Sequence, residues 1–341
     1  GAPSTDDESL KELILNRKWP SMGSPEKIAL ESLVSARKNL KLVSMLAGYE
    51  NNAVNLGDHW RIYPHYFSWR TTTHRSTADK GFQLWPHDKR VRGLLTARPG
   101  HVLLACDYSQ LQMRIAADLS QSESMKRLFT DKIDPHSWLA AQIIGEPDWT
   151  KIDKDSEARY CAKPCNFLLL FGAQPFTLRR QALTDYGLVW TEEQAKKYHD
   201  IFHDAYKLDP WYSRVAKELK DTGAIRSPLG AIRHLPNIHA GEAKQREEAL
   251  RQAINAPVQD VEVMIAYLAL WECYMAGYNI VAFLHDALYI EVLAELEDES
   301  KNQIAYIMET RVPEILDQDY GYKLSVPLEV DIKTTPCYDR V

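Results

Sequence analysis

Two aspartates stand where a metal-dependent transfer of phosphate could be built. Asp107 follows the compact apolar run 102–106, which begins after Pro99-Gly100 and predicts a buried strand. Asp286 lies between two β-rich runs, 280–284 and 288–292, which predict a hairpin with a short polar turn. Carboxylates fixed on neighbouring strands can hold two divalent ions that activate a hydroxyl and neutralise a leaving phosphate. The two aspartates are therefore a candidate catalytic pair.

The His-Asp dipeptide carries little information by itself. The chain has four such pairs, at 87/88, 199/200, 203/204 and 285/286, and His-Asp-Ala occurs twice. His203-Asp204-Ala205 falls in an amphipathic helical pattern, where a solvent-exposed face explains it. Only the pair at 285/286 is flanked by β-rich runs at a tight turn, so its context selects Asp286.

A second candidate group lies in the helical pattern at 157–171. Arg159, Lys163, Phe167 and Phe171 recur every four residues, so on a helix they form one slowly rotating stripe. Two cations at one end can hold a triphosphate, and two aromatic rings at the other end can stack on bases. Taken alone, the stripe also fits a helix with exposed bases and a core-facing aromatic pair.

The elements that must position these residues are helices and widely separated strands. Helical patterns cover 6–18, 25–47, 110–144, 157–171, 191–221, 243–259 and 261–275. Strands are predicted at 101–108 and on both sides of the hairpin turn, and 55–85 indicates loops and short strands. This mixture predicts an α+β chain with a sheet assembled from distant segments.

Composition sets wide bounds. A chain of 341 residues, 45% hydrophobic and 26% charged, can form one large or two modest globular domains. No apolar stretch is long enough for a bilayer and no signal peptide is present, so no membrane partner is expected. Five cysteines at scattered spacing favour a reducing compartment over a disulfide framework. The net charge of −6 does not decide for or against nucleic acid, because binding depends on local basic clusters.

Three motifs, in order along the chain, resemble those of the family A, or polymerase I-like, DNA polymerases. Residues 107–114, Asp-Tyr-Ser-Gln-Leu-Gln-Met-Arg, resemble the first catalytic motif, D-Y-S-Q-I-E-L-R. Residues 159–172 resemble the fingers-helix motif, R-x3-K-x3-F-x3-Y-G, and 283–287 resemble V-H-D-E. Weaker matches are 134–136 to D-I-H, 254–259 to I-N-A-P-M-Q, 73–76 to T-G-R-L, and 1–5 to the middle of the thumb. The resemblance covers essentially the whole chain.

The resemblance implies a right-hand polymerase fold, which is α+β with an antiparallel palm sheet and largely helical fingers. We expect residues 1–66 to form the end of the thumb and its connection to the palm. Residues 67–130 would be the first part of the palm, 131–235 the fingers, and 236–341 the second part of the palm. A start inside the thumb implies that the rest of the thumb and any exonuclease domain lie in an upstream part outside this chain.

The resemblance also implies an activity: template-directed addition of deoxynucleotides to a primer 3′ end by two-metal-ion phosphoryl transfer, in DNA replication or repair. Asp107 and Asp286 would bind two Mg²⁺ ions, for which Mn²⁺ can substitute, and the carbonyl of Tyr108 would add a ligand. The residues implied to contact or lie near the incoming nucleotide are Arg159, Lys163, Phe167, His136, Gln110, Gln112 and Phe171. Those implied to lie along the duplex near the primer terminus are Arg75, Arg251, Asn255, Gln259 and His285.

The partners implied are therefore primer-template DNA and deoxynucleoside triphosphates. The expected place of action is the cytoplasm of a bacterium or a phage-infected cell, with an organelle left open.

Two departures from the family pattern touch the chemistry. Gln112 stands where the family has Glu, the residue that crowds a ribose 2′-hydroxyl. Gln keeps the size and loses the charge, so we expect a steric block against ribonucleotides to remain. Ala287 replaces the Glu beside Asp286, which predicts reduced or retuned activity.

Three further departures lie in the fingers motif. Phe171 replaces Tyr and removes a hydroxyl, while Leu168 replaces Gly. Pro164 within a helix would remove one hydrogen bond and cost ~3 kcal/mol. It is tolerable where a helix starts near Lys163 or where a kink is used.

Two alternatives stay open at this point. Gln112 is compatible with a related enzyme of different substrate choice, such as an RNA-synthesising or translesion polymerase. The second alternative is an inactive relic that binds DNA or a replication partner. The retention of Asp107, Asp286, Arg159 and Lys163 argues against the relic.

Overall fold

The computed structural model describes residues 24–68, 70–79, 89–335 and 337, together with Leu10, Leu13 and Ile14. Apart from these last three residues, the helix expected at 6–18 lies outside the described residues. The thumb-like residues 1–5 lie outside them as well.

The helices and strands follow one another as an α+β chain. The helices are α2 (Pro25–Asn52), α3 (Lys89–Arg92), α4 (Leu111–Ser120), α5 (Glu123–Thr130), α6 (Pro135–Ile144), α7 (Glu157–Pro164), α8 (Pro175–Tyr186), α9 (Glu192–Tyr206), α10 (Asp209–Thr222), α11 (Ala243–Met275), α12 (Glu297–Tyr306) and α13 (Val312–Tyr320). The strands are β1 (Ala53–Asn55), β2 (Trp60–Ile62), β3 (Tyr66–Phe67), β4 (Thr77–Ala78), β5 (His101–Tyr108), β6 (Ala224–Arg226), β7 (Ile232–His234), β8 (Asn279–Leu284), β9 (Ala287–Leu293) and β10 (Val330–Thr335). Within the described residues, no helix is both long enough and apolar enough to cross a membrane.

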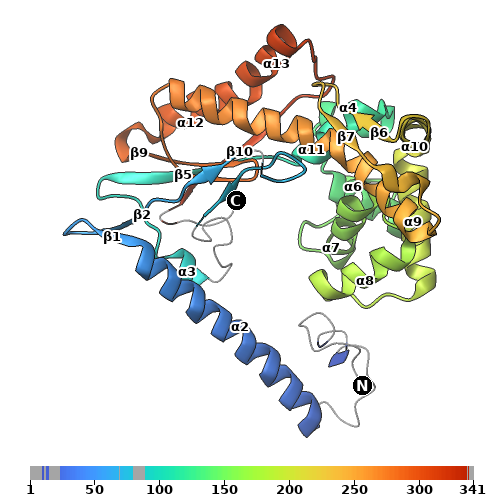
Figure 1. The fold of residues 1–341 in the computed structure, drawn as a ribbon, viewed down its shortest axis with the longest axis horizontal. Coiled ribbons are helices and arrows are strands. Elements are labelled where there is room, and N and C mark those ends of the chain that lie inside the picture. The colour runs from blue at the N-terminus through green and yellow to red at the C-terminus, as the bar shows by residue number, and fades with distance from the viewer. Residues whose placement is uncertain are drawn as a thin grey trace.

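A four-stranded antiparallel sheet, in the order β10-β5-β9-β8, joins three distant parts of the sequence. The expected strand at 101–108 is confirmed as β5, and the expected hairpin is confirmed as β8 and β9. In Figure 1 helices α11 and α12 lie on one side of this sheet, and α2 and α3 lie toward the other. Helices α6 to α10 form a separate helical group beside the sheet.

The two faces of β5 have different surroundings because side chains alternate along a strand. Leu104, Cys106 and Tyr108 belong to the large core that includes residues of α11 and α12. Ala105 belongs to a smaller cluster on the opposite face. Asp107 has the same parity as Ala105, so it lies on the face away from the large core.

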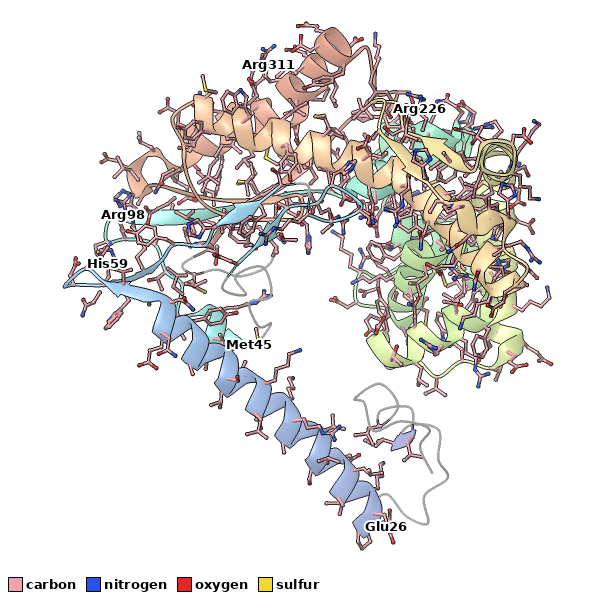
Figure 2. All side chains as sticks on the ribbon, viewed as in Figure 1. Glu26, Met45, His59, Arg98, Arg226 and Arg311 are labelled. Atoms are coloured by element: carbon pink, nitrogen blue, oxygen red, sulfur yellow. The ribbon has the colours of Figure 1, made fainter. Side chains whose placement is uncertain are left out.

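Helix α2 confirms the helix expected at 25–47 and continues to Asn52. Among its residues only Tyr49 is buried, and Leu40 and Val43 are exposed. Figure 2 shows its side chains along an arm that extends away from the sheet. The helix is therefore anchored mainly at its C-terminal end.

Several expected helices have different bounds. The pattern at 110–144 forms three helices, α4, α5 and α6. The single helix expected at 191–221 is wrong, because α9 ends at Tyr206 and α10 begins at Asp209. Lys207 adopts a positive φ of 52° between them, and Pro210 lies in the first turn of α10, where a residue without an N–H is tolerated.

The prediction of two helices at 243–259 and 261–275 is also wrong, because residues 243–275 form the single helix α11. The polar Asp260 separates the two apolar patterns in the sequence. In the structure its carboxylate accepts a hydrogen bond from Ser227 and pairs with His74, so it does not end the helix.

The helix expected over 157–171 also ends early. Ser156 caps its start, α7 stops at Pro164, and the chain widens into a π-helical turn at Cys165–Leu169. Pro164 has no N–H to donate, so the regular ladder is interrupted there. Tyr212 donates its hydroxyl proton toward the carbonyls of Leu169 and Leu170 at 3.0 and 3.1 Å, which gives these carbonyls a partner.

Candidate active site

The sheet brings Asp107 and Asp286 to the same end of two adjacent strands. Cys106 pairs with Leu288, and the hairpin closes with Leu284 opposite Ala287. His285 and Asp286 therefore form a two-residue turn beside the end of β5, with His285 at a positive φ of 58°. This is the juxtaposition that the sequence predicted for a metal-binding pair.

Negative charge is concentrated around Asp286. Burial, together with the charges of Asp107 and Glu262, raises the pKa of its carboxyl to about 8, while Arg75 opposes the shift. A carboxyl that resists ionisation among other carboxylates gains stabilisation from a nearby cation. The donor chemistry therefore fits a hard divalent ion, although within the described residues no three His, Cys, Asp or Glu side chains form a ready metal cage.

Tyr108 and Gln110 occupy different positions around this pair. The Tyr108 side chain is buried on the core side, and its hydroxyl donates to the carbonyl of Met308 at 3.0 Å. Because the side chain points into the core, only the main chain of Tyr108 can lie beside Asp107, as the predicted role of its carbonyl requires. Gln110 has a positive φ of 54° and precedes α4, and its Oε1 is buried without a hydrogen-bond partner among the described residues.

The two cations predicted to bind a triphosphate line an open hollow of about 370 Å³ at the start of α7. Arg159 and Lys163 both line it, together with Lys154. Arg159 also donates from Nε to Asp134 at 2.8 Å. Burial opposes ionisation of Asp134, but hydrogen bonds from Arg159 and Ser137 outweigh it and lower its pKa. Asp155 and Glu157 also line the hollow, so its three cations exceed its acids by one, and the positive balance suits an anionic group.

His136 lies beside this hollow in one defined tautomer. The Asn166 amide donates to the Pro135 carbonyl at 3.2 Å and lies 2.9 Å from His136 Nδ1. Tyr206 donates to Asn166 Oδ1 at 2.8 Å, which identifies the other amide atom as the donor. Nδ1 is therefore an acceptor and the ring proton is on Nε2. The ring of Phe167 lies 5.5 Å from that of His136, so the structure brings these two predicted residues together.

Burial lowers the pKa of His136 to about 4, helped by Arg159 and Lys163 and opposed by Asp134. The unfolded chain therefore binds more protons at this residue between about pH 4 and 6.5. Stability should fall as pH drops through that window, and His136 should contribute about 2 kcal/mol of the loss between pH 7 and 5.

We expect His136→Gln to remove this contribution, measured by urea unfolding at both pH values. The exposed His239→Gln is the matched control and should leave the parent's pH difference as it is. An unchanged pH difference in His136→Gln would contradict the assignment.

The residues expected along the duplex show two kinds of environment. Asn255 and Gln259 lie on α11, and the Oδ1 and Oε1 atoms of their amides are buried without partners among the described residues. Such atoms cost ~1–3 kcal/mol unless something donates to them. Arg251 pairs with Glu248 one turn earlier, and His285 is exposed at the hairpin tip.

Arg75 is held more firmly. Its Nη2 lies 2.9 and 2.6 Å from the two carboxylate oxygens of Glu262. Gln112 donates to the same carboxylate.

Phe171, expected in the nucleotide site, lies in the turn after the π-helical segment and packs partly buried against the main core.

Sequence reasoning missed Glu262 and Asn166. Glu262 is the one acid in the apolar segment Val261-Glu262-Val263-Met264-Ile265, and a charge in such a run indicates a buried, paired carboxylate. Asn166 carried no comparable signal outside the motif, since its role depends on His136 and Tyr206.

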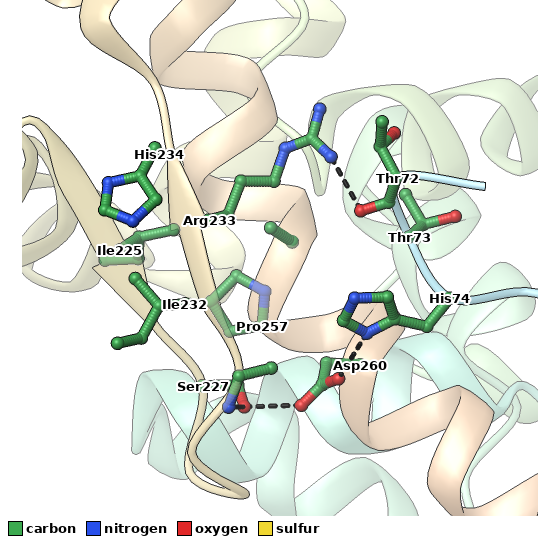
Figure 3. A pocket seen from close by; sticks show the side chains of 12 residues that line it. Thr72, Thr73, His74, Ile225, Ser227, Ile232, Arg233, His234, Pro257 and Asp260 are labelled. Carbon is green, nitrogen blue, oxygen red and sulfur yellow. Dashed lines mark hydrogen bonds and ion pairs between the residues drawn. The ribbon is translucent and has the colours of Figure 1, made fainter. Parts of the chain in front are cut away.

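A second cavity of about 290 Å³ lies between the loop at 72–74, the β6–β7 hairpin and α11 (Figure 3). Asp260 joins its walls, because it accepts from Ser227 on one side and pairs with His74 at 3.2 Å on the other. Arg233 donates to the carbonyl of Thr72 at 2.7 Å. These contacts hold the loop that carries Arg75 against α11.

Known proteins resemble this chain over most of its length. A family model described as DNA polymerase family A matches residues 1–340. A thermostable DNA polymerase I from Thermus filiformis is 28% identical over 283 residues, which is 80% of this chain and 32% of the relative. A DNA polymerase I from Pseudomonas aeruginosa is 29% identical over 252 residues, which is 70% of this chain and 26% of the relative. The chain thus spans about a third or less of the length of these relatives.

A solved structure has the same architecture. The POL domain of Pol1 from M. smegmatis, in complex with DNA primer-template and dNTP, matches with a TM-score of 0.79 at 24% identity. The match covers 98% of this chain and 56% of that one. This likeness confirms the polymerase fold expected from the sequence.

Proposed function

Because this chain belongs to DNA polymerase family A, we propose that it is a template-directed DNA polymerase that extends a primer 3′ end with deoxynucleotides. The observation that carries the proposal is the meeting of Asp107 and Asp286 at one end of the sheet, since this pair is what two-metal phosphoryl transfer requires. Replication or repair in a bacterial or phage-infected cell is the role that its bacterial relatives favour.

The two aspartates are the residues that would hold Mg²⁺, with the Tyr108 carbonyl as a further ligand. Two carboxylates leave the remaining positions to substrate oxygens and water, which is the coordination that Mg²⁺ prefers. When bound, the ions would lower the pKa of the primer hydroxyl and neutralise charge on the triphosphate.

The other residues bind and orient the substrates. Arg159 and Lys163 hold the triphosphate in the hollow at the start of α7. His136 donates from Nε2 to a phosphate oxygen and remains neutral at physiological pH, because burial lowers its pKa to about 4. Phe167, half-exposed beside His136, packs against the sugar.

The amides of the site make the polar contacts of the duplex and the nucleotide. Asn255 and Gln259 accept hydrogen bonds from the duplex, and Gln110 accepts one near the nucleotide. The oxygens of these amides are buried and have no hydrogen-bond partner in the part of the chain that the structure describes, which supports this assignment. Arg75, Arg251 and His285 complete the contacts near the primer terminus.

Primer extension on a short primed DNA template with Mg²⁺ tests the proposal. Template-dependent extension by the parent chain with deoxynucleotides is the expected result. Tight binding to primed DNA without extension would instead support the relic. Extension with ribonucleotides at equal or greater efficiency would support an enzyme of different substrate choice.

A further inference from the structure

A buried carboxylate connects the nucleotide side of the candidate site to the primer side. Glu262 on α11 is only 4% exposed, and both of its oxygens are engaged by two other segments. Gln112 Nε2 lies 3.0 and 3.2 Å from the two oxygens, and Arg75 Nη2 lies 2.9 and 2.6 Å from them. One carboxylate thus fixes two side chains expected to face different substrates.

The contact restrains Gln112 in a specific way. A glutamine side chain at the edge of a site is flexible, and a flexible side chain is a poor barrier to a hydroxyl group. The hydrogen bond from its amide to an ionised, buried acceptor is charge-assisted and therefore stronger than a neutral one. Because Nε2 is engaged by Glu262, the side chain has a fixed position beside the start of α4.

The same contact explains why position 112 is uncharged. A glutamate there would place a second carboxylate at hydrogen-bonding distance from Glu262, with no proton between them, and like charges this close repel. Glutamine supplies the N–H that Glu262 accepts. The identities of residues 112 and 262 are therefore coupled.

We propose that Glu262 is a specificity-determining positioning residue. It clamps Gln112 as a rigid wall against a ribose 2′-hydroxyl while it anchors Arg75 near the primer terminus. This inference rests on the proposed polymerase function and adds to it the residue that sets sugar choice.

The test is single-nucleotide incorporation on a primed DNA template with the matched substrates dCTP and CTP. The measured quantity is the ratio of kcat/KM for the two. A loss of charge near Asp286 affects both nucleotides alike, so the ratio isolates the sugar. We expect Glu262→Ala to increase relative CTP use about tenfold, equal to ~1.4 kcal/mol. The change should come mainly from improved CTP use.

A double-mutant cycle tests the clamp itself. Gln112→Ala should increase CTP use at least as much as Glu262→Ala, and the double variant should resemble Gln112→Ala alone. Gln112→Glu should impair incorporation by repulsion. The exchange Gln112→Glu with Glu262→Gln restores one donor and one acceptor and should recover the parent ratio.

Asp260→Asn is the matched control. Asp260 lies two residues before Glu262 and holds the same loop through His74, but its carboxylate contacts His74 and Ser227, whereas Gln112 contacts Glu262. We expect it to leave the sugar ratio within twofold of the parent.

The inference is wrong if Glu262→Ala keeps the parent ratio, if the two single effects add, or if the exchange variant fails to recover. A parent chain that extends no primer at all would refute the proposed function instead. In that event, the urea midpoints of the parent, the two single alanine variants and the double variant still test the contact between Gln112 and Glu262. Midpoint shifts that add in the double variant would show that the two residues do not interact.

Discussion

Asp286→Asn should lower primer extension by at least about a thousandfold, equal to ~4 kcal/mol of transition-state stabilisation. The variant removes one carboxylate of the pair that meets at the end of β5 and β9, and it keeps the size of the side chain. Binding of primed DNA should persist, since Asn255, Gln259 and Arg251 are untouched. Extension is measured by single-turnover incorporation and binding by fluorescence anisotropy.

The same variant should stabilise the metal-free chain at alkaline pH. Burial, Asp107 and Glu262 raise the pKa of Asp286 to about 8, so the folded state binds more protons there between about pH 4 and 8. Stability of the parent contributed by this group therefore falls as pH rises through that window, and Asn removes the loss. Urea unfolding with EDTA at pH 5 and pH 8.5 should show a larger gain at pH 8.5.

Asp204→Asn is the matched control, because Asp204 belongs to the other His-Asp-Ala tripeptide, at 203–205, and is exposed on α9. It should change neither extension nor the pH dependence of stability. More than a tenth of parent activity remaining in Asp286→Asn would refute the catalytic assignment.

Arg114→Met should lower the free energy of unfolding by about 3–5 kcal/mol, because two hydrogen bonds from a charged donor are each worth about 1.5–3 kcal/mol. Arg114 is 3% exposed and donates to the carbonyls of Ser109 and Pro327, each at 2.7 Å, and it pairs with Glu329. Methionine fills similar space but leaves those acceptors without the guanidinium. Urea unfolding measures the change as a shift in midpoint with an unaltered slope.

Arg179→Met is the control for this prediction. Arg179 pairs with Glu192 with both side chains substantially exposed, at 39% and 85%, so its loss should cost under about 1 kcal/mol. Equal shifts in the two variants would mean that the buried Arg114 does not hold the segment that follows β5. Since Ser109 lies between Tyr108 and Gln110, Arg114→Met should also reduce nucleotide incorporation.

Local patterns in the sequence were enough to predict the elements that carry the two aspartates. The strand at 101–108 and the hairpin around His285-Asp286 are specified by short-range features: an apolar run, a preceding Pro-Gly, and two β-rich runs around a polar pair. The ordered motifs then identified the family, because each motif is contiguous in the chain. The placement of the nucleotide and duplex residues remains a proposal.

Helix bounds depended on contacts that local patterns do not contain. The two apolar patterns on either side of Asp260 suggested two helices, yet partners from other segments, Ser227 and His74, satisfy its carboxylate within one helix. Conversely, the pattern at 191–221 continued through Lys207, where a positive φ ends α9 before α10 begins at Asp209. Periodicity detects a buried face, and tertiary partners decide whether the backbone continues.

By itself the sequence determined the family, the α+β class and the strands that bear Asp107 and Asp286, since these follow from contiguous residues. Only the tertiary structure decided which tautomer His136 adopts and which side chain fixes Gln112. Asn166, which contacts His136, lies in the π-helical turn after α7, and Tyr206, which orients Asn166, lies at the end of α9. Glu262 lies 150 positions from Gln112 and 187 from Arg75. Hydrogen bonds and desolvation act through space, so a pairing between residues this far apart leaves no periodic signal in the chain.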